Sequence, residues 1–168
     1  MARVAFNGNP VTTAGDLPAV GEMAPDFALA GKDLSDITLK EFAGKTVVLN
    51  IFPSIDTPVC AASVRRFNAE AAALGDTVVL CISADLPFAA GRFCTVEGID
   101  KALPASSFRA PEFGVQYGVA ITEGPLRGLL SRAVVIVGPD GKVRYAEQVA
   151  EMTREPDYEA ALRALAKE

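Results

Sequence analysis

One cysteine, Cys60, stands where a thiol could act as a nucleophile. It ends the stretch "NIFPSIDTPVC" (50–60), in which an apolar run passes into a loop holding two prolines, an acid and a threonine. Residues 46–52 are β-branched and apolar on both faces, which predicts a buried strand, and Thr57 or Pro58 is expected to begin a helix. Active sites of open α/β sheets lie at the carboxyl ends of strands, so this position favours a reactive thiol over a buried core residue.

The chain contains no histidine, so it has no Cys-His pair, no Ser-His-Asp triad and no histidine-ligated metal site. A thiolate at Cys60 would therefore depend on the positive end of its helix, on the hydroxyl of Thr57, or on a nearby arginine. Arg132 is a candidate, because it opens a strand expected beside 46–52, near the same end of the sheet. From the residues alone, the interpretation of Arg132 as a surface arginine is favoured, and Thr57 can be an ordinary helix N-cap.

The other two cysteines differ in their surroundings. Cys81 lies inside the apolar run 77–83, a second predicted buried strand, which indicates an inert structural thiol. Cys94 follows Cys60 by 34 residues (94 − 60) on a weak predicted helix interrupted by Gly91. Its position leaves two interpretations open, a partner thiol or a buried filler. No C-x-x-C motif is present, which argues against a thioredoxin dithiol and a paired-knuckle zinc site.

Bulk properties exclude several classes of function. The 168 residues are half apolar, carry a net charge of −5 and have a sequence pI near 4.8. An acidic chain is a poor nucleic-acid binder, and it is poorly suited to an anionic membrane surface. The first 21 residues show no apolar signal region, and no apolar run approaches the roughly 20 residues that span a bilayer. We expect a cytoplasmic protein that acts on small molecules or on other proteins.

The order of the expected elements is that of the thioredoxin arrangement, a parallel β-α-β unit followed by an antiparallel β-β-α unit. We therefore predict a single α/β domain over 1–168, with a central mixed β-sheet flanked by helices and an N-terminal β-hairpin extension at 1–16. The other expected elements are strands at 27–30 and 37–39, a helical turn ended by Gly44, strand 46–52, a helix from 57 or 58 to about 74, strand 77–83, a helix within 86–98, a short strand or loop and one or two helical turns within 106–121, strands 132–137 and 143–149, and a helix at 156–167.

Several motifs resemble those of the thiol peroxidases, a branch of the peroxiredoxins. The general motif Pro-x-x-x-Thr-x-x-Cys is matched by Pro53, Thr57 and Cys60. Further matches, in the family's order, are "GNPVTTAGDLPAVGEMAPDF" (8–27), "DLPFAAGRFC" (85–94), "YGVAI" (117–121), "GPLRGLLSRAVVIV" (124–137) and "EPDYEAAL" (155–162). The resemblance covers essentially the whole chain.

The resemblance implies a peroxidase that needs no cofactor: no metal, haem or flavin. Cys60 would attack the peroxide and become a sulfenic acid, and Cys94 would then form an intramolecular disulfide with it, which thioredoxin would reduce. Pro53 would shield the thiolate, Thr57 would hydrogen-bond the sulfur and orient the peroxide, and Arg132 would stabilise the developing charge. The family also implies a homodimer, and the apolar loop 121–132 suits a subunit contact or a pocket for alkyl hydroperoxides.

Three other functions compete with this one. A thiol-disulfide oxidoreductase of the same fold would need the missing dithiol motif. A non-enzymatic thioredoxin-like binding or chaperone module would leave Cys60 structural. A peroxidase could also be resolved by an external thiol instead of Cys94.

Overall fold

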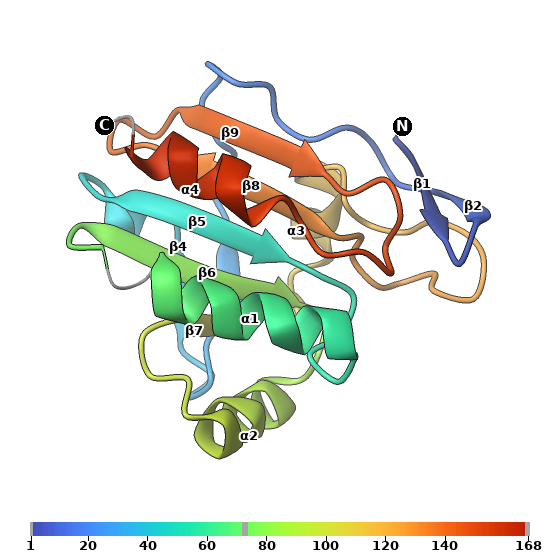
Figure 1. Cartoon of the computed structure of the whole chain (residues 1–168), viewed down its shortest axis with the longest axis horizontal. Helices are drawn as coiled ribbons and strands as arrows, with labels where there is room; N and C mark the ends of the chain where they lie inside the picture. The colour runs from blue at the N-terminus through green and yellow to red at the C-terminus, as the bar shows by residue number, and fades with distance from the viewer. Residues whose placement is uncertain (1, 72–73, 167–168) are drawn as a thin grey trace.

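A mixed β-sheet organises the chain in the computed structural model, which describes residues 2–71 and 74–166 (Figure 1). Its strands are β3 (Ala28–Ala30), β4 (Asp36–Thr38), β5 (Thr46–Ile51), β6 (Thr77–Ser83), β7 (Leu103–Ser106), β8 (Ala133–Val137) and β9 (Val143–Gln148). Within the described residues the spatial order is β4-β3-β7-β6-β5-β8-β9. The neighbours β5, β6 and β7 run parallel, whereas β8 and β9 are antiparallel to their neighbours. This confirms the predicted α/β class and thioredoxin-like arrangement.

Strand β5 is an interior strand between β6 and β8, and most of its side chains are apolar on both faces of the sheet. Val47, Leu49 and Ile51 enter the core on one face of the sheet, and Val48 enters the core on the other face together with Phe52. Every residue of β5 is buried. The continuous apolar run therefore predicted the strand correctly.

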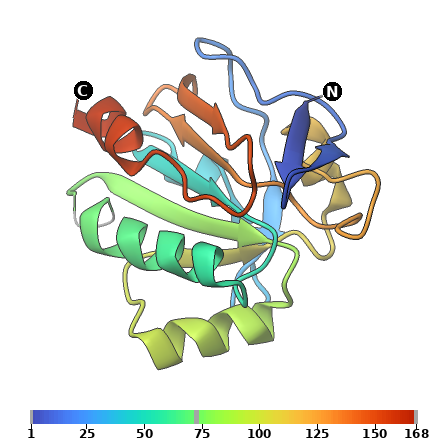
Figure 2. The same cartoon turned by 45° about the vertical axis from the view of Figure 1, so that its right-hand side comes forward.

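Helices cover both faces of this sheet. They are α1 (Pro58–Glu70), α2 (Pro87–Glu97), α3 (Pro111–Gln116) and α4 (Tyr158–Ala166), with a 3-10 turn at η1 (Lys40–Phe42). Helices α1 and α4 lie in front of the sheet and α3 lies behind it, while α2 lies below α1, beside β7 (Figures 1 and 2). Helix α1 connects β5 to β6, and α2 connects β6 to β7. Both helices therefore begin at the end of the sheet where β5 and β6 end. Among the described residues, none of these helices has both the length and the apolar content needed to cross a bilayer.

Some predicted element ends were wrong. Helix α1 ends at Glu70 instead of Leu74, and the Leu74 N–H bonds to the Ala71 carbonyl. Residues 72 and 73 lie outside the described part of the chain. Helix α4 begins two residues later than predicted, since the Asp157 carboxylate accepts the Ala160 N–H and caps it there.

Residues 107–110 form a loop, one of the two forms expected at the start of 106–121, and a strand precedes them. This strand is β7, whose Leu103 and Pro104 face Leu80 and Cys81 of β6. Pro104 weakened the sequence signal for a strand, because proline cannot donate to a ladder. The fold tolerates it, since β3 pairs with β7 through one registered position only.

The predicted N-terminal hairpin is present as β1 (Arg3–Phe6) and β2 (Asn9–Thr12). Asn7 and Gly8 form its turn with φ values of 51° and 79°, as a two-residue hairpin turn requires. The Glu151 carboxylate accepts the Gly8 N–H at 2.7 Å and so ties this turn to the segment after β9. The hairpin thereby lies at the end of the sheet toward which β5 and β9 point (Figure 1).

Candidate functional site

Cys60 is the third residue of α1, at the carboxyl end of β5, as predicted. Its side chain is fully buried among residues of the α1 face of the core, and the thiol is free. In the first turn of a helix the backbone N–H groups lack helical acceptors and carry a positive partial charge. The sulfur therefore lies where negative charge is electrostatically favoured.

Arg132 brings a fixed cation to this sulfur. Its Nη2 donates to Cys60 Sγ at 3.1 Å, and its Nε donates to the Met152 carbonyl at 2.9 Å. The contact follows from sheet topology, because β8 runs antiparallel to β5 and pairs Ala133 with Ile51. The residue before β8 therefore meets the loop after β5.

Arg132 is only 2% exposed, so the interpretation of it as a surface arginine is wrong. Its Nη1 has no hydrogen-bond partner in the part of the chain that the structure describes. Leaving a buried donor without a partner is costly for folding, and a catalytic role is one explanation for such a group. Here the free donor can bind an incoming oxygen beside Cys60.

Thr57 occupies the N-cap position of α1, but its side chain does not cap the helix. The hydroxyl donates to the Ser54 carbonyl at 3.0 Å. This differs from the expected hydrogen bond to the sulfur, because the proton of the hydroxyl is already engaged within the loop. The lone pairs of the oxygen remain available to accept a hydrogen bond from a substrate.

A cavity of about 270 Å³ opens beside this group of residues. Pro53, Thr57 and Arg132 line it, and Arg132 joins the cavity to the fully buried sulfur of Cys60. Most of the remaining wall is apolar. It comes from the segment around Cys60 and from three distant parts of the chain: Ser54, Pro58 and Val59, then Phe6, Leu126 with Leu129, and Met152 with Thr153. The cavity thus suits a small molecule with a polar oxygen at one end and an apolar group at the other.

The two remaining cysteines are also free and buried. Burial in β6 raises the pKa of the Cys81 thiol to about 12, which makes it inert near neutral pH, as predicted. Cys94 lies in α2 and is 8% exposed, and its burial raises the pKa of its thiol, an effect that Lys32 partly opposes. It is seven residues after Pro87, about 10 Å along the helix axis from the end where α2 begins.

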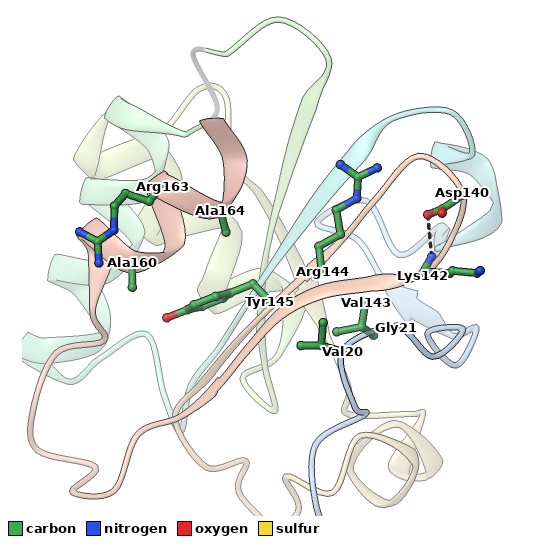
Figure 3. A pocket seen from close by; sticks show the side chains of 10 residues that line it. All are labelled: Val20, Gly21, Asp140, Lys142, Val143, Arg144, Tyr145, Ala160, Arg163 and Ala164. Carbon is green, nitrogen blue, oxygen red and sulfur yellow. Dashed lines mark hydrogen bonds between the residues drawn. The ribbon is translucent and has the colours of Figure 1, made fainter. Parts of the chain in front are cut away.

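A larger groove, of about 620 Å³, lies between α4 and β9, away from the cysteines. Figure 3 shows that its cationic side chains diverge: Arg163 on α4 points away from Arg144 and Lys142 on the β8–β9 hairpin. No cysteine lines it. Neither a nucleophile nor a convergent set of charges marks this groove as a reaction site.

Sequence reasoning missed the parts of the site that distant segments supply. The Met152 carbonyl that holds Arg132, the Phe6 side chain on the cavity wall and the Asp85 carboxylate that holds Ser54 at 2.8 Å had no local signal. They meet the Cys60 loop, residues 52–57 between β5 and α1, only after the sheet has formed.

Comparison with known proteins agrees with this geometry. A family model described as Redoxin matches residues 19–162. Thiol peroxidases of Mycobacterium tuberculosis (strain H37Rv) and Corynebacterium glutamicum are 57% and 52% identical to this chain over 165 residues, which are 98% of this chain and 99% of each relative.

Solved structures show the same likeness. The peroxiredoxin-like protein from Aquifex aeolicus has a TM-score of 0.93 and 37% identity, covering 99% of this chain and 97% of its own. The thiol peroxidase from Chromobacterium violaceum has a TM-score of 0.88 and 25% identity, covering 98% and 95%. The chain therefore belongs to the redoxin family and, within it, to the thiol peroxidases.

Proposed function

We propose that this protein reduces hydroperoxides with Cys60 as the peroxidatic cysteine and Cys94 as the resolving cysteine. The observation that carries the proposal is the contact of 3.1 Å between Arg132 Nη2 and Cys60 Sγ at the start of α1, beside an apolar cavity. A buried cation there stabilises a thiolate, and its free Nη1 can stabilise a second negative charge on a substrate oxygen. A core cysteine would need neither.

The first step is a displacement at oxygen. The Cys60 thiolate attacks the terminal oxygen of ROOH, an S–O bond forms, the O–O bond breaks, and the leaving alkoxide takes up a proton to become the alcohol. Arg132 stabilises the charge as it moves from sulfur to oxygen, and the Thr57 oxygen accepts a hydrogen bond from the peroxide. Pro53 is buried at the cavity wall and keeps water from the sulfur.

The second step joins two cysteines that are free and buried on different helices of the folded chain. The Cys94 thiolate attacks the Cys60 sulfenic acid, the disulfide forms and hydroxide leaves as water. Burial in α2 raises the pKa of Cys94, so the folded helix disfavours the thiolate that must react. We infer that α2 unwinds in this step.

Helix α2 is suited to unwinding at low cost. Only Pro87, Ala90 and Cys94 of its residues are buried, and Gly91 lies in its middle. Its end is tied to α1 by an exposed ion pair of 2.8 Å between Arg65 and Glu97, which contributes little to stability. A thioredoxin-type dithiol would then reduce the disulfide.

Counting thiols after one pulse of hydroperoxide tests the function. We expect rapid loss of two thiols per chain, joined as Cys60–Cys94 by peptide mapping, with Cys81 spared. At pH 8 a thiol with a pKa of about 12 is ionised in about one molecule in 10⁴, and rising pH deprotonates it only as the pH approaches that value. The Cys60→Ser variant should lose no thiol rapidly. Slow, unselective loss would instead indicate a binding module with a structural Cys60.

The apolar cavity predicts a preference for organic hydroperoxides. We expect a higher kcat/KM for cumene hydroperoxide than for hydrogen peroxide. Phe6→Ala removes one apolar contact in the cavity, so it should lower the ratio of the two kcat/KM values about three- to tenfold. Steady-state assays with both peroxides measure the ratio. Phe108→Ala, at a phenylalanine outside the cavity, is the matched control. Equal values for the two peroxides in the unmodified chain would contradict the preference.

The resemblance also predicts a homodimer in the cytoplasm with thioredoxin as its reductant. Sedimentation velocity of the reduced protein tests the dimer. Turnover supported by thioredoxin, compared with turnover supported by a monothiol at equal thiol concentration, tests the reductant.

A further inference from the structure

We propose that Asp85 is a positioning residue that holds the Cys60 loop in its peroxide-reactive form and that must release the loop before the disulfide can form. The inference deepens the proposed function and rests on it. It assigns a role to a side chain that touches neither sulfur and does not line the cavity of the site.

The Asp85 carboxylate binds the Cys60 loop at two points. Oδ1 accepts the Ser54 hydroxyl at 2.8 Å, and Oδ2 accepts the Ile55 N–H at 2.7 Å. Oδ2 also accepts the Ser83 hydroxyl at 2.7 Å, which fixes the carboxylate to the end of β6. Hydrogen bonds to an ionised carboxylate are stronger than those between neutral groups, so these contacts hold the loop firmly.

The loop transmits this anchoring to the reactive residues. The Ser54 carbonyl accepts both the Thr57 hydroxyl at 3.0 Å and the Thr57 N–H at 3.3 Å, and Thr57 is the N-cap of the helix that carries Cys60. Asp85 therefore fixes Ser54, Ser54 fixes Thr57, and Thr57 sets where α1 begins. The Arg132–Cys60 contact depends on that starting point.

Asp85 also lies just before α2, the helix that carries Cys94. It lies two residues after β6 and two residues before Pro87, the first residue of α2. The Ser106 hydroxyl of β7 donates to the Asp85 backbone carbonyl, and this bond holds the segment before α2 on the sheet. One residue thus links the loop before Cys60 to the segment that leads to Cys94, the two segments whose cysteines the proposed disulfide joins.

Two reactions of the Cys60 sulfenic acid compete, and the hydrogen bonds of Asp85 to the loop should determine their relative rates. In one, Cys94 displaces hydroxide from the sulfenic sulfur to give the disulfide and water. In the other, the sulfenate attacks a second ROOH, takes one oxygen to become a sulfinic acid and releases ROH. A firmly held loop favours the second reaction at high peroxide, whereas a released loop favours the first.

The test is Asp85→Ala, with two steps measured separately in rapid-mixing experiments. We expect sulfenic acid formation to slow by about fivefold to tenfold, because the loop is no longer preorganised, and disulfide formation to accelerate by a similar factor. The fraction of Cys60 found as sulfinic acid by mass spectrometry after a pulse of excess peroxide should fall accordingly. Asp85→Asn should restore much of the unmodified behaviour, since a flipped amide can accept from Ile55 and donate to Ser54.

Further variants separate this role from a general loss of stability. Ser54→Ala removes one of the two contacts between Asp85 and the loop. It should slow sulfenic acid formation and accelerate disulfide formation, as in Asp85→Ala, but by smaller factors. If Asp85→Ala does not fold, Ser54→Ala alone provides the test. Asp140→Ala, which removes a carboxylate that accepts the Lys142 N–H in the turn at the other end of β8, should change neither rate. Hydrogen exchange at the Ile55 amide should accelerate in Asp85→Ala without any peroxide.

Opposite shifts of the two rates, with faster Ile55 exchange, support the inference. Equal rates in Asp85→Ala and the unmodified chain, or slowing of both steps, would overturn it while leaving the proposed function intact. An unmodified chain that forms no Cys60–Cys94 disulfide would overturn the proposed function and this inference with it, even if Ile55 exchange responded as expected.

Discussion

Replacing Arg132 with Met is expected to lower the second-order rate constant for hydroperoxide reduction by about 10² to 10³. The variant keeps an unbranched side chain of similar length but loses the donor that contacts Cys60 Sγ at 3.1 Å and the free Nη1 beside the cavity. Both the thiolate and the charge on the leaving oxygen lose their fixed partner. Competition for peroxide against a reporter peroxidase measures the rate constant, since the chain has no tryptophan for intrinsic fluorescence.

Two further variants make this result specific. Arg132→Lys keeps the charge but not the planar fork that bonds sulfur and the Met152 carbonyl together, so its rate constant should fall between those of Met and Arg. Arg66→Met removes a cation from the exposed face of α1, where it pairs with Glu70, and should leave the rate constant unchanged. A rate constant for Arg132→Met within about threefold of the unmodified value would show that the buried cation is structural.

Replacing Cys94 with Ser is expected to abolish thioredoxin-supported turnover while leaving the first reaction with peroxide intact. The serine hydroxyl cannot attack the sulfenic acid, so each chain should consume one hydroperoxide rapidly and then stop. With excess peroxide, Cys60 should accumulate as the sulfinic acid, because nothing in the chain removes the sulfenic acid first. A coupled thioredoxin assay and intact-protein mass spectrometry measure the two effects.

Cys81→Ser is the matched control for that experiment. It makes the same change at the buried thiol that takes no part in the proposed mechanism, where it costs about 1 kcal/mol of stability but should leave turnover unchanged. If Cys94→Ser instead retained full turnover with thioredoxin, the internal disulfide would be wrong and an external thiol would resolve Cys60.

Local patterns in the sequence predict much of the fold. The continuous apolar runs of β5 and β6, the Asn7-Gly8 turn and the proline at the start of α1 each satisfy a local requirement that neighbours along the chain decide. The end of α1 did not follow from such a pattern. It depends on where the chain must turn to begin β6, and alanine-rich helical sequence does not signal that point.

That one cysteine follows a buried strand at a helix start, in a chain without histidine, can be predicted from the residues because those facts are local and compositional. The surroundings of that sulfur depend instead on contacts between distant segments. Antiparallel pairing of β8 with β5 brings Arg132 to Cys60 across 72 residues, and the hairpin and the segment after β9 bring Phe6 and Met152 to the cavity. The physical reason is that hydrogen bonds and apolar contacts between distant segments exist only once the sheet has set their register.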